Sequence, residues 1–415
     1  MKQYTTFIFD SFHFDEKTGG LELKYSLDDE IHFTEKLTFP GYELRVTSYE
    51  SLQAAMFGLH MIGGISYFKT CLPKKMEIRS GSLTKDQADF WNTVYENGLG
   101  EFFFRNKIDF RGLINFPIDE NIQNSKFKIQ NSETHGKALV PIGGGKDSLV
   151  TIELLKKEGV DLTLFRLGSH PLITKMADIA ERPLLTVERS LDSQLFELNK
   201  QGALNGHIPI SAYLSWLTVV TSILYGFDSI VMSNEKSANE GNVEYLGKEI
   251  NHQWSKSEEF EKMFADYIHQ NVSPSLTYFS LLRPLSELQI AKLFAGFPKY
   301  FDVATSCNAN WKIAGSDQRV AGSGRWCGKC PKCAFAFAIL GAFIPKDQLL
   351  SMFGKNLFDE DVLTTYYGEL LGLEGFKPFE CVGTVEETHA AFTLMHQAEN
   401  YEETKAMKIF LASSN

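Results

Sequence analysis

The chain has 415 residues, 43% of them hydrophobic, and a formal net charge of −11 at pH 7. This length allows a full buried core and two or three domains. The acidic balance argues against a general nucleic-acid partner, because counterion release on binding needs a basic surface. No export or transit signal precedes the strand-like sequence after Tyr4, so we expect a cytoplasmic protein.

Residues 1–40 alternate apolar and polar side chains between short turn sequences, which predicts an antiparallel meander. Residues 48–72 and 84–97 have the pattern of helices. We expect these elements to form a small α+β domain over residues 1–130. The polar stretch 117–135, rich in Asn and Ser, is interpreted as a linker.

A glycine-rich loop follows the apolar strand-like run 138–142 and opens an amphipathic helix that stops at Gly159. A second apolar run, 162–167, completes one βαβ unit. Glycines let a backbone approach an anion closely, and a helix N-terminus behind them favours negative charge. The unit therefore predicts a nucleotide-phosphate site. The loop residues are Gly143, Gly144, Gly145, Lys146, Asp147 and Ser148.

This loop is not a Walker A loop, because Asp147 follows Lys146 where Ser or Thr is required. The dinucleotide pattern also fails, since Ser148 stands at its third glycine. The loop resembles the S-G-G-x-D-S motif of the N-type ATP pyrophosphatases, with Gly143 replacing the first serine. That resemblance implies that the loop backbone and the Ser148 hydroxyl hold pyrophosphate, with Asp147 facing Mg²⁺. The alternative is an ordinary strand-to-helix turn with Asp147 as the N-cap.

Strands and helices continue to alternate up to residue 305, which predicts a doubly wound parallel sheet over residues 131–305. The uncharged run 208–227 is long enough to span a bilayer. Its Ser and Thr residues and the strand directly behind it favour a core helix instead. We expect no membrane partner.

Polar clusters follow several of these predicted strands. Asn234 and Glu235 come directly after the strand 228–232, at the sheet edge where open α/β sheets bind ligands. His252 and Lys256 lie in a segment dense in hydrogen-bonding groups, and Arg283 follows another strand-like run. His207 and His252 are each more often structural histidines than catalysts when taken alone.

Three cysteines have the spacing C-x2-C-x2-C, and a fourth precedes them across a loop. Four thiolates at such spacing match a closed, tetrahedral structural zinc site. An iron–sulfur cluster is the alternative, and disulfides are disfavoured without an export signal. The predicted ligands are Cys307, Cys327, Cys330 and Cys333.

The metal would staple the Cys307 loop onto a helix over residues 335–343, within a C-terminal helical region over residues 306–415. Lys312, Arg319 and Arg325 lie between the cysteines and supply positive charge for a phosphorylated substrate. The two remaining cysteines are expected to be buried free thiols. They are Cys71 and Cys381.

Seven segments, read together, resemble the UDP-N-acetylmuramoyl-L-alanyl-L-glutamate epimerases of bacterial peptidoglycan synthesis. The resemblance covers the chain from about residue 5 to about residue 385. The segments are PIGGGKDS at 141–148, NGHIP at 205–209, SNE at 233–235, NHQWSK at 251–256, RPLSE at 283–287, RWCG at 325–328 and KPFECVG at 377–383.

The resemblance implies inversion of the terminal L-Glu of UDP-MurNAc-L-Ala-L-Glu to D-Glu, with ATP and Mg²⁺ required and AMP and diphosphate released. Converting the glutamate α-carboxylate to an acyl-adenylate removes its negative charge and makes the α-proton more acidic. Alternatives are another adenylating enzyme, such as an amidating or thiolating ligase, and a non-catalytic nucleotide- and zinc-binding protein. The candidate proton-transfer residues are Glu235, His252 and His207, and the candidate substrate-binding residues are Asn234, Lys256, Arg283 and Arg325.

Overall fold

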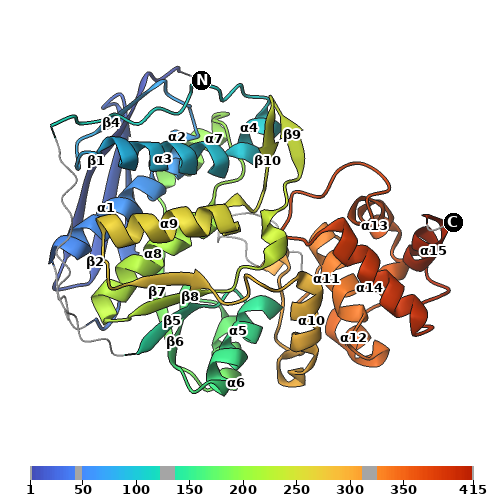
Figure 1. The fold of residues 1–415 in the computed structure, drawn as a ribbon. Coiled ribbons are helices and arrows are strands. Elements are labelled where there is room, and N and C mark those ends of the chain that lie inside the picture. Colours follow the sequence, from blue (N-terminus) through green and yellow to red (C-terminus); the bar gives the residue numbers. More distant parts are fainter. Residues whose placement is uncertain (1, 43–48, 122–135, 311–324, 414–415) are drawn as a thin grey trace.

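The structure is a computed structural model that describes residues 2–42, 49–121, 136–310 and 325–413 (Figure 1). The strands are β1 Thr6–Asp15, β2 Gly20–Leu27, β3 Ile31–Thr38, β4 Lys75–Ile78, β5 Lys137–Pro141, β6 Asp161–Leu167, β7 Leu184–Ser190, β8 Ser229–Met232, β9 Val243–Tyr245, β10 Lys248–Ile250 and β11 Thr277–Ser280. The helices are α1 Tyr49–Gly63, α2 Ile65–Phe68, α3 Lys85–Gly98, α4 Gly100–Asn106, α5 Lys146–Lys157, α6 Pro171–Ala180, α7 Ser193–Lys200, α8 Ile210–Tyr225, α9 Glu258–Asn271, α10 Glu287–Ala295, α11 Pro331–Gly341, α12 Lys346–Phe353, α13 Thr364–Leu370, α14 Val385–Gln397 and α15 Lys405–Ser413.

One nine-stranded sheet runs in the order β11-β8-β5-β6-β7-β3-β2-β1-β4. The first five strands are parallel. The expected meander β1-β2-β3 is antiparallel, with β4 parallel to β1. The meander is not a separate sheet, because residues 36–38 of β3 pair antiparallel with residues 188–190 of β7. The domain boundaries at residues 130 and 305 stay predictions, and the strands on either side of residue 130 share one sheet.

Helices cover both faces of the parallel strands, as expected for a doubly wound sheet (Figure 1). Leu139 and Ile230 face the buried cluster that includes α8 and α9. Their neighbours Val140 and Val231 face the cluster that includes α5, α6 and α10. This alternation follows from the two-residue period of a strand. The fold is therefore mixed α/β with a large sheet in which parallel pairs dominate.

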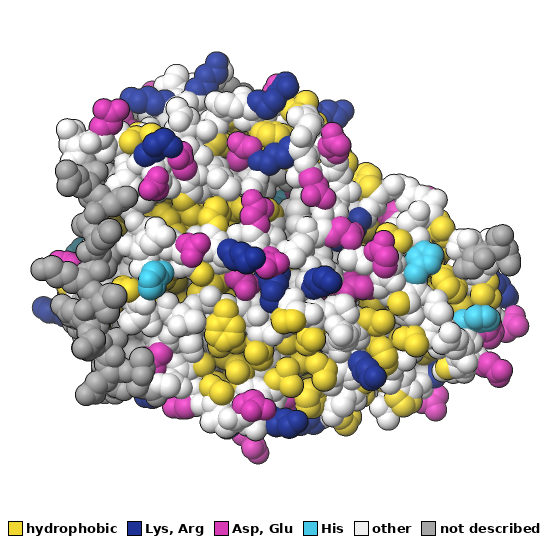
Figure 2. Space-filling model, in the orientation of Figure 1, with side chains coloured by type: hydrophobic (Ala, Val, Ile, Leu, Met, Phe, Trp, Pro, Cys, Tyr) yellow, Lys and Arg dark blue, Asp and Glu magenta, His cyan; other side chains and the backbone are white. Residues whose placement is uncertain are grey.

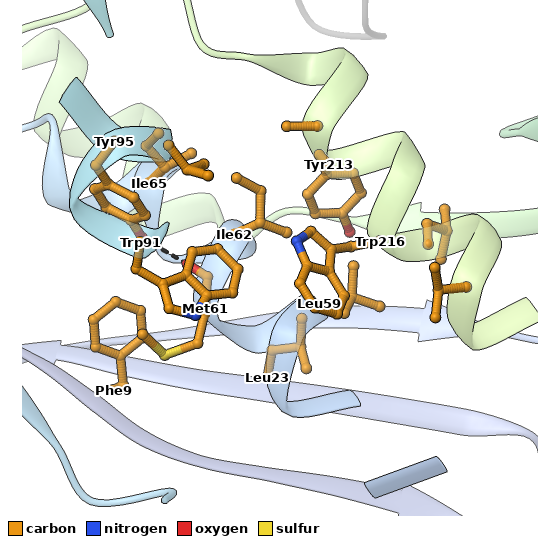
Figure 3. Packing of buried hydrophobic residues seen from close by; sticks show 14 of the residues in the cluster. Phe9, Leu23, Leu59, Met61, Ile62, Ile65, Trp91, Tyr95, Tyr213 and Trp216 are labelled. Atoms are coloured by element: carbon orange, nitrogen blue, oxygen red, sulfur yellow. Dashed lines mark hydrogen bonds between the residues drawn. The ribbon is translucent and has the colours of Figure 1, made fainter. Parts of the chain in front are cut away.

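The helices over the N-terminal strands pack closely on α8. Trp91 of α3 and Trp216 of α8 stack with ring centroids 5.5 Å apart (Figure 3). Beside them the Tyr95 hydroxyl donates a 2.6 Å hydrogen bond to the Met61 carbonyl (Figure 3). A Cβ atom at Gly58 of α1 would lie 2.0 Å from the Trp216 ring, so the helix can approach only with glycine there. The N-terminal strands and the helices on one face of the parallel strands therefore share one hydrophobic core.

The long apolar helix predicted over residues 211–225 is α8, and it lies in this core. Across the ranges that the structure describes, no helix is long and apolar enough to cross a membrane. Residues 122–135 of the predicted linker lie outside the described residues.

Helices α11–α15 form the C-terminal part, which packs beside α10 (Figure 1). The helix predicted over residues 335–343 is α11, which begins earlier, with Pro331 in its first turn. Proline is favoured there because its missing N–H would have no intrahelical partner. Figure 2 shows acidic side chains interspersed with basic ones on the face drawn there.

Candidate active site

A cavity of about 270 Å³ opens at the carboxyl ends of β5 and β8. The chain runs outward from β5 to β6 and β7, and returns to the other side of β5 as β8. Ligands bind at such a reversal in open α/β sheets. The glycine loop and the segment after β8 meet there, as expected. Together they contribute Gly143, Gly145, Lys146, Asp147, Ser148, Ser233, Asn234 and Glu235 to the lining.

The glycine loop has the backbone of a strand-to-helix connection without a side-chain cap. Gly144 has a φ of +87°, in the region that favours glycine. Its carbonyl accepts a 2.9 Å hydrogen bond from the Thr305 N–H. The N-cap of α5 is Gly145, and no side chain accepts a hydrogen bond there. The alternative with Asp147 as the N-cap is therefore wrong, and the positive end of α5 faces the cavity.

Three carboxylates gather below the loop. Oxygen atoms of Asp147, Glu235 and Glu287 lie within 4.8 Å of one another. The Lys146 ammonium donates to Asp147 at 2.6 Å and also forms an ion pair with Glu287. Burial raises the pKa of Glu287 to about 8, with Asp147 and Glu235 adding to the shift and Lys146 opposing it. Such an oxygen cluster could hold a divalent cation, which would favour the charged form of Glu287.

Lys256 and Cys381 form a second ionisable pair in the cavity wall. The Lys256 ammonium lies 3.2 Å from the Cys381 sulfur, and both residues line the cavity. Behind them the His252 imidazole hydrogen-bonds Glu101 through Nδ1 and also interacts with Cys381. His207 is 3.4 Å from the same Glu101 carboxylate. Neither histidine lines the cavity.

The pKa values of this group are strongly displaced. Burial lowers the pKa of His252, but its bonds to Cys381 and Glu101 raise it to about 9. Burial raises the pKa of the Cys381 thiol, yet Lys256, Lys332 and His252 together bring it well below its ordinary value. Burial and the neighbouring His252 lower the pKa of His207 to about 4. The arrangement therefore favours a thiolate, a cationic His252 and a neutral His207.

The predicted substrate-binding residues separate into two groups. Asn234 and Lys256 line the cavity. Arg283 instead donates 2.7 Å hydrogen bonds to the carbonyls of Glu235 and Lys256 and pairs with Glu261.

Arg325 lies against the backbone, where its guanidinium donates to the carbonyls of Asp302 and Met352. Among the described residues of the C-terminal part, the cation that lines the cavity is Lys332, which sequence reasoning missed. Lys312 and Arg319 lie outside the described residues.

The predicted four-cysteine grouping is confirmed. The four sulfur atoms, of Cys307, Cys327, Cys330 and Cys333, lie within 4.8 Å of one another. Cys333 Sγ is 3.5 Å from Cys330 Sγ and 3.7 Å from Cys327 Sγ. A tetrahedral ion about 2.3 Å from each sulfur needs sulfur–sulfur edges of about 3.8 Å. The cluster could therefore hold one metal ion.

Part of the cavity lining is apolar, and Trp326 in it precedes the cluster residue Cys327 in the chain. This apolar part consists of Phe294, Phe335, Leu340, Met352 and Trp326. The Trp326 ring stacks on Phe353 at 4.4 Å, and its buried indole N–H has no hydrogen-bond partner among the described residues. A planar ring with a hydrogen-bond acceptor on its edge would fit this apolar part.

Fold and site together define an α/β protein with a carboxylate-lined cavity at the switch point of its sheet and a four-thiol cluster beside it. The MurL N-terminal domain model matches residues 1–281, and the MurL C-terminal domain model matches residues 303–415. The chain belongs to the MurL family.

Three curated relatives carry the name UDP-N-acetyl-alpha-D-muramoyl-L-alanyl-L-glutamate epimerase. The protein of Xanthomonas oryzae pv. oryzae is 40% identical over 99% of this chain and 90% of its own length. That of Salinispora tropica is 36% identical over 99% and 89%, respectively. That of a Micromonospora strain is 35% identical over 98% and 90%. The chain thus matches these relatives over nearly their whole length.

Proposed function

We propose that this protein converts the terminal L-Glu of UDP-MurNAc-L-Ala-L-Glu to D-Glu at the expense of ATP, in bacterial peptidoglycan synthesis. The names and full-length similarity of the relatives support the reaction. The observation that carries the proposal is the cavity itself, which is lined by a helix N-terminus, a carboxylate cluster and the Cys381 thiol.

We infer that the glycine loop binds ATP in the manner of the ATP pyrophosphatases. The N-terminus of α5 and the Lys146 ammonium supply positive charge for the phosphates, and the apolar part of the lining that includes Trp326 suits adenine. Asp147, Glu235 and Glu287 would hold Mg²⁺, which neutralises the charge that develops on the departing diphosphate.

The chemistry begins when a carboxylate oxygen of the substrate attacks the α-phosphorus of ATP. The new O–P bond replaces the bond to diphosphate, and the resulting mixed anhydride carries no negative charge at the carboxyl carbon. Its α-proton can then leave and return on the opposite face. Water finally cleaves the anhydride and releases AMP. Lys256 and Lys332 would bind the acidic substrate beside the loop.

Zinc is the proposed occupant of the cysteine cluster, because the sulfur spacing suits one tetrahedral ion bound by four thiolates. Its role would be structural, since four thiolates leave no open position for substrate. A cytoplasmic location is part of the same proposal, because the reaction consumes ATP and a nucleotide-linked substrate.

The decisive experiment is incubation with ATP, Mg²⁺ and UDP-MurNAc-L-Ala-L-Glu in D₂O, following AMP, glutamate chirality and deuterium at Cα. We expect AMP together with deuterated D-Glu. AMP without D-Glu would instead indicate an amidating or thiolating ligase that lacks its acceptor. Absence of both AMP and diphosphate would indicate a non-catalytic nucleotide-binding protein.

A further inference from the structure

Cys381 differs from the other five cysteines of the chain in its position. Four of them form the metal-type cluster, and Cys71 lies outside the cavity lining. Cys381 belongs to the segment between α13 and α14 and lines the same cavity as the glycine loop. It meets Lys256, which lies 125 residues away in the chain.

The groups around the thiol stabilise its ionised form. The Lys256 ammonium lies 3.2 Å from Sγ. Lys332 and the His252 imidazole also lower the pKa of the Cys381 thiol. Glu101 accepts a hydrogen bond from His252 Nδ1 and so fixes the ring that faces Cys381. Glu380 and Glu235 are the acidic groups near the thiol. Cysteine thiolates form in such partly exposed sites beside cations.

We propose that Cys381 is the base that removes the α-proton of the activated glutamate, with Lys256 and His252 as positioning residues that hold its thiolate toward the cavity. This assignment rests on the proposed function, because only activation of the carboxyl makes that proton acidic enough to transfer.

The Sγ lone pair takes the α-proton, so an S–H bond forms while the Cα–H bond breaks. The electron pair of that bond moves into the neighbouring acyl group as an enolate. Water protonates Cα from the opposite face, and the hydroxide left behind receives the thiol proton. Hydrolysis of the anhydride then releases AMP and the inverted carboxylate.

The other candidate bases fit this role less well. Glu235 shares a cation-type site with Asp147 and Glu287, so its oxygens would be occupied when Mg²⁺ is bound. His252 is engaged by Glu101 and Cys381, and His207 stands behind it. Both histidines lie outside the cavity lining. Cys381 is therefore the basic group with direct access to the substrate.

The test compares Cys381→Ser with Cys71→Ser, the matched control at a half-buried thiol elsewhere. In the assay with ATP, Mg²⁺ and the L-Glu substrate in D₂O, we expect Cys381→Ser to form diphosphate while deuterium exchange at Cα falls at least about 100-fold. Cys71→Ser should match the wild type in both. Thermal unfolding of each variant, together with retained diphosphate formation, separates loss of the base from loss of the fold.

Exchange by Cys381→Ser at more than a tenth of the wild-type rate would overturn the assignment. So would a dipeptide covalently attached to Cys381 in a denatured reaction sample, because the residue would then be a nucleophile. Failure of the wild type to form AMP would reject the proposed function itself, which is a different result. Iodoacetamide gives an independent readout, since substrate and ATP should protect Cys381 and leave Cys71 unprotected.

Discussion

Asp147 is the carboxylate of the glycine loop, at the start of α5 and in contact with Lys146. Replacing it with Asn keeps its shape but removes one charge from the proposed Mg²⁺ site. We expect diphosphate release by Asp147→Asn to fall about 100- to 1,000-fold, because Mg²⁺ stabilises the charge on the departing group. Raised Mg²⁺ should restore part of this loss.

The control for that change is Asp161→Asn, an exposed carboxylate at the start of β6. Because β6 is parallel to β5, Asp161 lies at the opposite end of the sheet from the glycine loop. Its rate should equal that of the wild type. An unchanged rate in Asp147→Asn would remove this carboxylate from the proposed Mg²⁺ site.

Cys381 and His252 also make a prediction about pH and stability. Near neutral pH the folded pair holds a thiolate and an imidazolium, whereas the unfolded chain holds a thiol and a neutral imidazole above pH 6.5. Both states of the pair bind one proton. The pair therefore does not make the free energy of unfolding depend on pH between 6.5 and about 8.5.

Removing either partner should make the free energy of unfolding depend on pH, with opposite signs in the two variants. In Cys381→Ser, Glu101 remains to raise the pKa of His252, so we expect the folded state to bind the extra proton and stability to fall as pH rises above 6.5. In His252→Asn, Lys256 and Lys332 remain to lower the pKa of Cys381, so we expect stability to rise with pH toward 9.0. Each slope can reach about 1.4 kcal/mol per pH unit. Urea unfolding between pH 6.5 and 8.5 measures both, and equal slopes would contradict the ion pair.

Sequence reasoning located the glycine loop and the cysteine cluster because each depends on neighbours in the chain. It classed Cys381 as a buried free thiol, since no local pattern shows that this residue meets Lys256. Arg283 was predicted to bind substrate as a cation after a strand, but its guanidinium donates hydrogen bonds to backbone carbonyls. Whether a cation faces the cavity or the chain depends on tertiary contacts that a motif does not contain.

At the scale of elements, a buried ion pair joins the meander to the parallel strands. Arg189 of β7 donates to both oxygens of Glu35 of β3, at 2.9 and 3.1 Å. The Glu35 side chain has 0% exposure and also accepts hydrogen bonds from Tyr67 and Tyr213. The antiparallel joint between β3 and β7 therefore depends on one fully enclosed carboxylate.

We expect Glu35→Gln to lower the free energy of unfolding by about 3–5 kcal/mol, because it leaves the Arg189 charge buried without a partner. The double variant Glu35→Leu with Arg189→Met should regain much of this loss. Asp89→Asn breaks the exposed pair with Lys85 and serves as the control, with an expected change under about 1 kcal/mol. Urea denaturation gives all three values, and a loss in Glu35→Gln no larger than the control would contradict the role of this pair.

Elements with clear periodicity were predictable, such as the meander β1–β3, the strands β5 and β6, and the helices α5 and α8. The joint between the two sets of strands was not, because strand pairing over long sequence distances leaves no local pattern. Short elements such as β4 and the β9-β10 hairpin were missed for a related reason, as three or four residues show little periodicity.

For the whole molecule, the cysteine cluster connects the C-terminal helices to the cavity. Trp326 precedes Cys327 directly, Phe335 follows Cys333 by two residues, and both line the cavity. Cys330→Ser should therefore lower the zinc content below one ion per chain, reduce the melting temperature, and weaken ATP-dependent AMP formation. Cys71→Ser should change none of these. Full stability in a wild-type protein that contains no metal would contradict a structural zinc.

Residues from the middle of the chain and residues from its C-terminal part together line the cavity, and this has a consequence for synthesis on the ribosome. A nascent chain that has just finished the parallel strands already presents the glycine loop, but Lys332, Phe335 and Cys381 have still to emerge. Until they do, the part of the cavity lining that these residues supply is missing. The proposed ATP site would therefore be complete only after the C-terminal segment has been synthesised.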